Sequence, residues 1–139
     1  MRPVEGHTLW IGNRGDVQRP GQARAAGIEA IVDLAVEEAP LPFHREGILL
    51  RVPLCDGGGN EASLLRLAVV SLELLVRARV PTLVVCSAGL SRSPAVAAWA
   101  CARATAGDAH EVLKALAARG PIDVAPALWG QLCAAMAQS

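Results

Sequence analysis

Aromatic side chains are scarce in this sequence, and their scarcity argues against one class of partner. The chain contains no Tyr, one Phe and three Trp. Proteins that bind single-stranded nucleic acid stack the bases on aromatic side chains, and duplexes are bound through an excess of basic charge. Here 13 Lys and Arg residues balance 13 Asp and Glu residues, so the formal net charge is zero. We therefore expect no nucleic-acid partner.

Long apolar runs are also missing, although 53% of the residues are hydrophobic. No uninterrupted run approaches the roughly 20 residues that a membrane-spanning helix needs. The first ten residues, MRPVEGHTLW, lack the apolar centre of a signal peptide. The length of 139 residues suits one domain. We expect a single domain over residues 1–139, cytoplasmic, monomeric and without a membrane partner.

The four cysteines lack the spacing of a metal site. Cys55, Cys86, Cys101 and Cys133 form no Cys-x2-Cys pair, so we expect no zinc and no other cofactor. Cys101 and Cys133 fall on apolar helix faces and are interpreted as small core residues. For Cys55 two readings stay open. It is either buried, or close enough to Cys86 to form a protective disulfide under oxidation.

The most informative stretch is VVCSAGLSRSP, residues 84–94. Its apolar start predicts a buried strand that ends at Cys86, and a helix is expected from about Pro94. The small residues between Cys86 and Arg92 let the backbone N–H groups turn around one anion, next to the positive end of the helix. Arg92 adds a planar donor that matches a phosphate. Such an electropositive site favours a nucleophilic thiolate at Cys86.

A second loop, CDGGGN at residues 55–60, follows a predicted strand at Ile48–Leu54 and precedes a predicted helix at Glu61–Arg79. Strand, helix and the next strand, Thr82–Cys86, favour two parallel strands joined by a crossover. The carboxyl ends of parallel strands share one edge of the sheet, so Asp56 can face the same crevice as the thiol. The alternative is that Asp56 is a turn residue in a glycine-rich loop.

The other predicted elements complete an α/β fold: a small mixed, mostly parallel sheet with helices on both faces. Further strands are predicted at Thr8–Ile11 and Ile28–Ala35, and further helices at Arg19–Ala26, Pro94–Ala106, Ala109–Arg119 and from Pro126. In the helix at 61–79 the predicted apolar face consists of Leu65, Val69, Leu72 and Val76. Glu73 and Arg77 are predicted to form an i,i+4 surface pair on the opposite face.

The loop sequence CSAGLSRS resembles the signature Cys-x-Ala-Gly-x-Ser-Arg-Ser of the dual-specificity branch of the Cys-dependent protein tyrosine phosphatase superfamily. The resemblance extends loosely from about Thr8 to Leu132, through LWIGN, IVDLA and RGPIDVAPALWGQL. It implies the protein tyrosine phosphatase fold. It also implies hydrolysis of phosphate monoesters through a cysteinyl-phosphate intermediate, with a phosphorylated protein (phosphotyrosine, and also phosphoserine or phosphothreonine) or a small phosphate monoester as substrate.

The resemblance also implies roles for individual residues. Cys86 is the nucleophile, Arg92 binds the phosphate, Asp56 is the general acid and then the base, and the Ser93 hydroxyl helps the sulfur to leave. No metal is required. The phosphate-binding loop consists of Ser87, Ala88, Gly89, Leu90, Ser91 and Arg92.

Three positions depart from the family pattern. Val85 stands where the family has a His that helps to fix the loop, Asp33 stands where Asn is usual, and Ala125 also replaces an Asn. We interpret Asp33 as structural and expect slower turnover because Val85 can only pack.

Two alternative functions remain. The first is the same chemistry on an inositide, a sugar phosphate or an RNA 5′ end, which the lack of a basic loop residue beyond Arg92 disfavours. The second is a phosphate-binding module without catalysis, which would not need the Cys86 thiolate.

Overall fold

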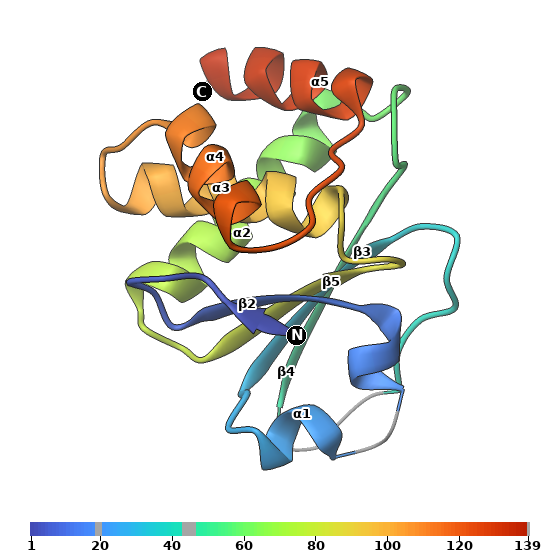
Figure 1. Cartoon of the computed structure of the whole chain (residues 1–139). Coiled ribbons are helices and arrows are strands. Elements are labelled where there is room, and N and C mark those ends of the chain that lie inside the picture. The colour runs from blue at the N-terminus through green and yellow to red at the C-terminus, as the bar shows by residue number, and fades with distance from the viewer. Residues whose placement is uncertain (19–20, 43–46, 139) are drawn as a thin grey trace.

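The computed structural model describes residues 1–18, 21–42 and 47–138, which form one mixed β-sheet with helices on both faces (Figure 1). The strands are β1 (Arg2–Pro3), β2 (Leu9–Asn13), β3 (Ala30–Ala35), β4 (Ile48–Leu54) and β5 (Thr82–Cys86). The helices are the 3-10 helix η1 (Arg14–Val17), α1 (Gln22–Ala25), α2 (Ala62–Arg77), α3 (Arg92–Ala104), α4 (Ala109–Arg119) and α5 (Pro126–Ala137).

The order of the strands places β5 inside the sheet. Within the described residues the order is β1-β2-β5-β3-β4, with β1 antiparallel to β2 and the other neighbours parallel. Strand β5 has a neighbour on each side, and all of its residues are buried. The prediction of a mixed, mostly parallel sheet is confirmed. Because β2, β3, β4 and β5 all run the same way, the loops that follow them leave from one edge.

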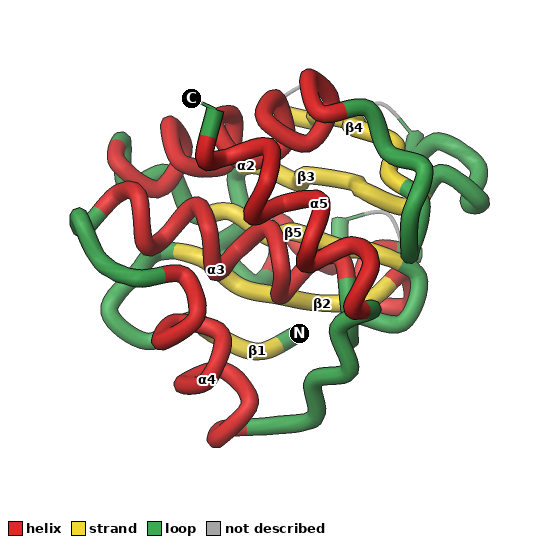
Figure 2. Tube along the Cα trace, turned by 90° about the horizontal axis from the view of Figure 1, so that it is seen from above, coloured by secondary structure: helices red, strands yellow, loops and turns green. Residues whose placement is uncertain are grey.

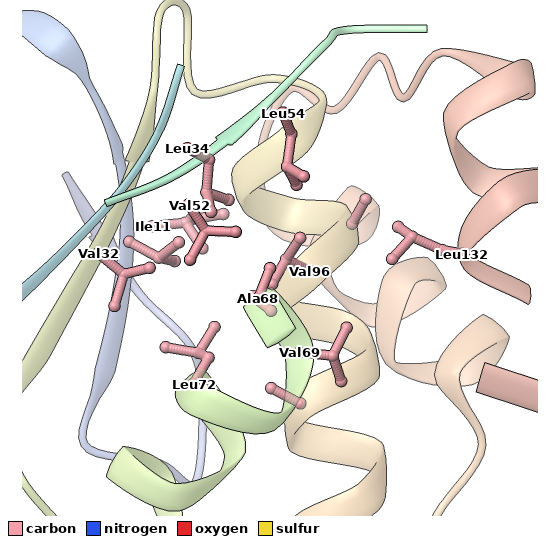
Figure 3. Packing of buried hydrophobic residues seen from close by; sticks show 14 of the residues in the cluster. Ile11, Val32, Leu34, Val52, Leu54, Ala68, Val69, Leu72, Val96 and Leu132 are labelled. Carbon is pink, nitrogen blue, oxygen red and sulfur yellow. The ribbon is translucent and has the colours of Figure 1, made fainter. Parts of the chain in front are cut away.

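Most of the core lies between the sheet and the layer formed by α2, α3, α4 and α5. Figure 2 shows this layer from above, with α2, α3 and α5 lying over the strands. In Figure 3, side chains from β2, β3 and β4 point toward α2 and α3, and Leu132 of α5 closes the cluster. Burying each such Leu stabilises the fold by about 1.5–3 kcal/mol relative to leaving it exposed. The labelled residues are Ile11, Val32, Leu34, Val52, Leu54, Ala68, Val69, Leu72, Val96 and Leu132.

The opposite face of the sheet carries α1, η1 and a much smaller apolar cluster (Figure 1). The buried members of this cluster are Val17, Ala23, Ile28, Leu83 and Val85. Side chains alternate between the two faces of a strand, so Val84 joins the main core while Val85 joins the small cluster. The prediction that Val85 packs against apolar neighbours is confirmed.

Several predicted boundaries agree with the structure, and others shift. The strands Ile48–Leu54 and Thr82–Cys86 and the helix Ala109–Arg119 have the predicted ends. Helix α1 is shorter than predicted, and its predicted first residues, Arg19 and Pro20, lie outside the described residues. Strand β1 was not predicted, because a strand of two residues has no periodicity to detect.

Helix α3 begins and ends earlier than predicted. It starts at Arg92 rather than near Pro94 and stops at Ala104. Beyond its end, Ala106 adopts a φ of 53°, so an alanine takes the left-handed conformation that usually favours glycine. The N–H of Gly107 then donates to the carbonyl of Ala102.

The prediction that Glu73 lies on the solvent face of α2 is wrong. Glu73 follows Val69 by one helical turn, so it lies at the border of the buried face, and α3 covers it. The side chain accepts hydrogen bonds from Arg77 at 2.8 Å, as predicted, and from Arg103 of α3 at 2.6 Å. Burial raises the pKa of Glu73, but the hydrogen bonds from Arg103 and Arg77 outweigh it, and the pKa is lowered.

The cysteines behave differently from one another. Cys101 is buried, as predicted, and burial raises the pKa of its thiol to about 12. Cys133 is only half-buried, and burial raises its pKa as well. Of the two readings for Cys55, burial is wrong, because this residue opens the loop that follows β4 and is exposed.

None of the helices in residues 1–18, 21–42 and 47–138 combines the length and the apolarity that crossing a bilayer requires.

Candidate active site

The Cys86 thiol lies at the junction of β5, the following loop and the first turn of α3. Cys86 is 2% exposed. Its Sγ lies 3.1 Å from Oγ of Ser93, and the backbone N–H of Ser93 donates to the sulfur at 3.5 Å. The Ser93 hydroxyl also contacts the carbonyl of Gly12, at 3.3 Å. The first turn of α3 and a hydroxyl therefore both face the sulfur.

The Cys86–Arg92 loop is held from outside by two other segments. The N–H of Arg14 donates to the carbonyl of Ser87 at 3.2 Å, and the N–H of Asp123 donates to the carbonyl of Leu90 at 2.8 Å. Gly89 has a φ of +75°, and a Cβ at this position would lie 2.9 Å from the carbonyl carbon and oxygen of Gly12. Only glycine fits both the backbone conformation and the space. The loop therefore packs against β2 and is hydrogen-bonded to the segment that precedes α5.

Arg92 is the most buried cation of the site. It is 2% exposed, and its guanidinium donates through both terminal nitrogens to Glu37, at 2.5 and 2.6 Å. One of these nitrogens also donates to the carbonyl of Leu54 at 2.9 Å. The Nε–H is buried and has no hydrogen-bond partner among the described residues. Burial lowers the pKa of Arg92, but Glu37 outweighs it and the pKa is raised. Arg92 is therefore a cation held in place by Glu37, with its Nε–H unpaired within the described part of the chain.

Sequence reasoning missed Glu37 as a residue of this site. Nothing in the local sequence singles out Glu37, and 55 positions separate it from Arg92. Its side chain is 50% exposed. The hydrogen bond from Arg92 lowers the pKa of Glu37 from 4.5 to about 2. The Ser87 hydroxyl faces Glu37 at 3.0 Å and the neighbouring Glu38 at 3.1 Å. The available signal was an acidic pair after a strand that runs parallel to β5.

The structure brings Asp56 to the Cys86–Arg92 loop, as the parallel strands predict. The hydroxyl of Ser91 donates to Oδ1 of Asp56 at 2.6 Å and accepts from the N–H of Ala125 at 3.0 Å. The charge of Asp56 also contributes to the raised pKa of Arg92. The Asp56 loop is itself tied together by Asn60, whose side chain accepts from the N–H of Cys55 at 2.8 Å and donates to its carbonyl at 3.0 Å.

The candidate catalytic residues Cys86, Arg92, Ser93 and Asp56 therefore lie around one loop. In the part of the chain that the structure describes, no group of three or more His, Cys, Asp and Glu side chains could hold a metal ion. The positive groups of the site are the Arg92 guanidinium and the amino-terminal end of α3, and the carboxylates of Glu37, Glu38 and Asp56 lie beside the same loop.

Comparison with known proteins identifies structural relatives. No protein-family model and no curated protein matches the sequence. Human DUSP28 is 26% identical, with a TM-score of 0.78 over 95% of this chain and 96% of that one. DUSP15 is 23% identical, with a TM-score of 0.79 over 95% and 84%.

A human tyrosine phosphatase-like serine/threonine/tyrosine-interacting protein is 16% identical, with a TM-score of 0.77 over 94% of this chain and 92% of that one. Over nearly its whole length the chain thus resembles dual-specificity phosphatases and has their fold.

Proposed function

We propose that this chain, which has the fold of the dual-specificity phosphatases, is a Cys-dependent phosphatase. Its reaction is the hydrolysis of phosphate monoesters through a cysteinyl-phosphate intermediate on Cys86. The observation that carries the proposal is the position of Cys86 Sγ, 3.1 Å from the hydroxyl of Ser93 and at the start of a loop that ends in the buried guanidinium of Arg92. A phosphate-binding module would need the arginine but not the thiol.

In the first step the Cys86 thiolate attacks phosphorus, and the bond to the ester oxygen breaks. The backbone N–H groups of the loop and Nε–H of Arg92 donate to the phosphoryl oxygens, whose charge is thereby stabilised. The leaving oxygen departs as an alcohol only if it receives a proton. Asp56, held beside the loop by Ser91, is the group that donates it, and general acid catalysis of this kind contributes about 10²–10⁴-fold.

In the second step water attacks the same phosphorus atom and the bond to sulfur breaks. Asp56, now deprotonated, takes the proton from the water, and inorganic phosphate is released. The sulfur leaves as a thiolate. The Ser93 hydroxyl, which also lies close to the Gly12 carbonyl, rotates its proton toward the sulfur and stabilises the leaving charge.

The charges around the loop favour a substrate with one phosphate on a protein side chain. Glu37, Glu38 and Asp56 all contact residues of the Cys86–Arg92 loop, and among the side chains that the structure describes there the cation they surround is Arg92. A second phosphate on the substrate would face these carboxylates and be repelled. We therefore favour phosphotyrosine, phosphoserine and phosphothreonine in proteins over inositides. Four free thiols, including Cys86, fit the reducing conditions of the cytoplasm.

The test is hydrolysis of an aryl phosphate in the presence of a chelator. Wild-type protein should release the phenol, and Cys86→Ser should not, while still binding inorganic phosphate in a calorimetric titration. Cys133→Ser is the matched control, since it makes the same replacement on α5. We expect it to keep wild-type activity. A wild-type protein that binds phosphate but hydrolyses nothing would instead be a phosphate-binding module.

A further inference from the structure

Asp33 is a buried carboxylate that the proposed reaction does not use. It is 0% exposed and lies near the end of β3. One oxygen, Oδ2, accepts hydrogen bonds from Arg51 at 2.7 Å and Arg14 at 3.2 Å, while Oδ1 accepts from the N–H of Ala35 at 3.3 Å. The register of β3 against β4 shifts between Asp33 and Ala35, so the strand bulges where the carboxylate sits.

Both arginines also donate hydrogen bonds to backbone carbonyls of residues 35 to 39, a segment called the 35–39 loop below. Arg51 donates to the carbonyl of Ala35 at 3.2 Å and to that of Glu38 at 2.8 Å, with a longer contact to Val36. Arg14 donates to the carbonyl of Ala39. Carbonyls along the whole loop are therefore fixed by two cations that share one buried anion.

The 35–39 loop presents Glu37 to the candidate active site. Glu37 holds both terminal nitrogens of Arg92, which orients the guanidinium and leaves its Nε–H as the donor without a partner. We propose that Asp33 is a positioning residue for phosphate binding, acting through Arg14, Arg51 and the 35–39 loop to hold Glu37 against Arg92. This inference rests on the proposed function of the Cys86 site.

The sheet register pairs Asp33 with Val85, the other residue at this level of the sheet that departs from the family pattern. Asp33 and Val85 are opposite each other in the parallel ladder of β3 and β5. Both are departures from the family pattern, and both face the side of the sheet that carries α1, since their neighbours Val32 and Val84 face the main core. Because Val85 has an apolar side chain, it offers Asp33 no hydrogen bond from β5. The Asp33 carboxylate instead accepts hydrogen bonds from Arg14 and Arg51.

Positioning and simple electrostatics predict opposite outcomes when the charge is removed. Asp33→Asn takes away a negative charge and leaves two arginines less compensated, so long-range electrostatics alone would make an anion bind more tightly. If Asp33 acts by positioning, the 35–39 loop loosens, Glu37 releases Arg92 and phosphate binds more weakly. Arg51→Lys separates the effects further, because it conserves the charge but lacks the fork that reaches several carbonyls at once.

The experiment measures the affinity for inorganic phosphate in the Cys86→Ser background, which requires no turnover. Asp33→Asn and Arg51→Lys should each weaken binding by about 2- to 30-fold, the range of couplings carried by packed polar networks. Glu73→Gln is the matched control, since Glu73 also holds two arginines on partly buried hydrogen bonds, but on α2 and α3. It should bind phosphate as the Cys86→Ser parent does.

A second readout uses Cys86 itself, in the wild-type background. Iodoacetate is an anion and iodoacetamide is neutral, and both alkylate only the thiolate, so the ratio of their rates reports how well Arg92 attracts an anion. The ratio should fall in Asp33→Asn and Arg51→Lys and stay constant in Glu73→Gln. Unchanged or tighter phosphate binding in Arg51→Lys overturns the proposal, and that variant decides alone if Asp33→Asn does not fold. If the wild type hydrolyses aryl phosphate while both variants bind phosphate normally, the positioning role fails and the phosphatase stands.

Discussion

Replacing Glu37 by glutamine is the sharpest test of the ion pair that holds Arg92. The carboxylate makes hydrogen bonds of 2.5 and 2.6 Å to the two terminal nitrogens of the guanidinium. Glutamine keeps the shape and one acceptor oxygen but loses the charge and the bidentate geometry. Arg92, which is 2% exposed, would then retain one bond to the glutamine oxygen, the carbonyl of Leu54 and a long contact to Ser87.

The size of the effect follows from the pKa of Glu37, which the hydrogen bond from Arg92 lowers from 4.5 to about 2. In a fully buried group this lowering would correspond to about 3 kcal/mol, since each pKa unit is worth about 1.4 kcal/mol. The Glu37 side chain is 50% exposed, and solvent screens the pair. We therefore expect Glu37→Gln to lower the free energy of unfolding by about 1 kcal/mol near neutral pH.

The same pKa sets the pH dependence. A carboxyl whose pKa is lower in the folded protein than in the unfolded chain contributes stability above its unfolded pKa, and this contribution is lost as the pH falls toward the folded pKa. The difference in unfolding free energy between wild type and Glu37→Gln should therefore be constant above about pH 5 and shrink toward zero near about pH 2.

Urea unfolding of both proteins at a series of pH values measures this difference. Glu38→Gln is the control, because its side chain contacts Ser87 but not Arg92. We expect a change of no more than about 0.5 kcal/mol for this variant. Equal stability of wild type and Glu37→Gln near neutral pH, or a difference that persists unchanged in acid, would show that the ion pair contributes nothing measurable and would refute the reasoning.

Three further substitutions test the other parts of the site. Asp56→Asn should slow hydrolysis of poor leaving groups by about 10²-fold or more and that of good ones much less; equal slowing across a series of aryl phosphates would mean that another group is the acid. Ser93→Ala should slow the release of phosphate from Cys86, which a pre-steady-state burst of phenol reveals; a burst no larger than in wild type contradicts the role. Gly89→Ala should lower the unfolding free energy by about 1–3 kcal/mol, because of its φ of +75° and the 2.9 Å approach to Gly12; urea unfolding measures this, and an unchanged midpoint would contradict it.

The parts of the site that lie close together in the sequence could be predicted from it. Cys86 ends β5, and Arg92 and Ser93 begin α3 after the loop at residues 87–91, so their contact needs only local geometry. Asp56 was reached by one further step, the rule that parallel strands end at the same edge. Strands β4 and β5 were predicted with their observed ends because apolar β-branched runs are bounded there by turn residues.

The supporting contacts could not be predicted, because each depends on where two distant segments pack. Glu37 reaches Arg92 from the loop that follows β3, a strand whose register against β4 shifts between Asp33 and Ala35. Glu73 was assigned to the wrong face because its second partner, Arg103, belongs to another helix. The periodicity of apolar residues within one helix or strand does not indicate which side chains of other elements will pack against it.

Val85, the residue before Cys86, allows a test that involves both the local sequence of the site and a contact with a distant strand, β3. Val85 is 0% exposed among apolar neighbours and lies opposite Asp33, whose carboxylate already holds Arg14 and Arg51. Introducing the family's histidine, Val85→His, would leave the imidazole unpaired or draw Asp33 away from the arginines.

An unpaired buried polar group costs about 1–3 kcal/mol, so the unfolding free energy should fall by about this amount in urea titrations. Phosphate binding in the Cys86→Ser background should weaken as well, because the 35–39 loop loses its anchor. Val85→Ala, which only removes packing, is the control that should lower stability without weakening phosphate binding. A histidine variant that is as stable as wild type and binds phosphate more tightly would contradict this account. Such a result would mean that the hydrogen bonds of a histidine improve the site, and that phosphate binding does not depend on the hydrogen bonds between Asp33 and the two arginines.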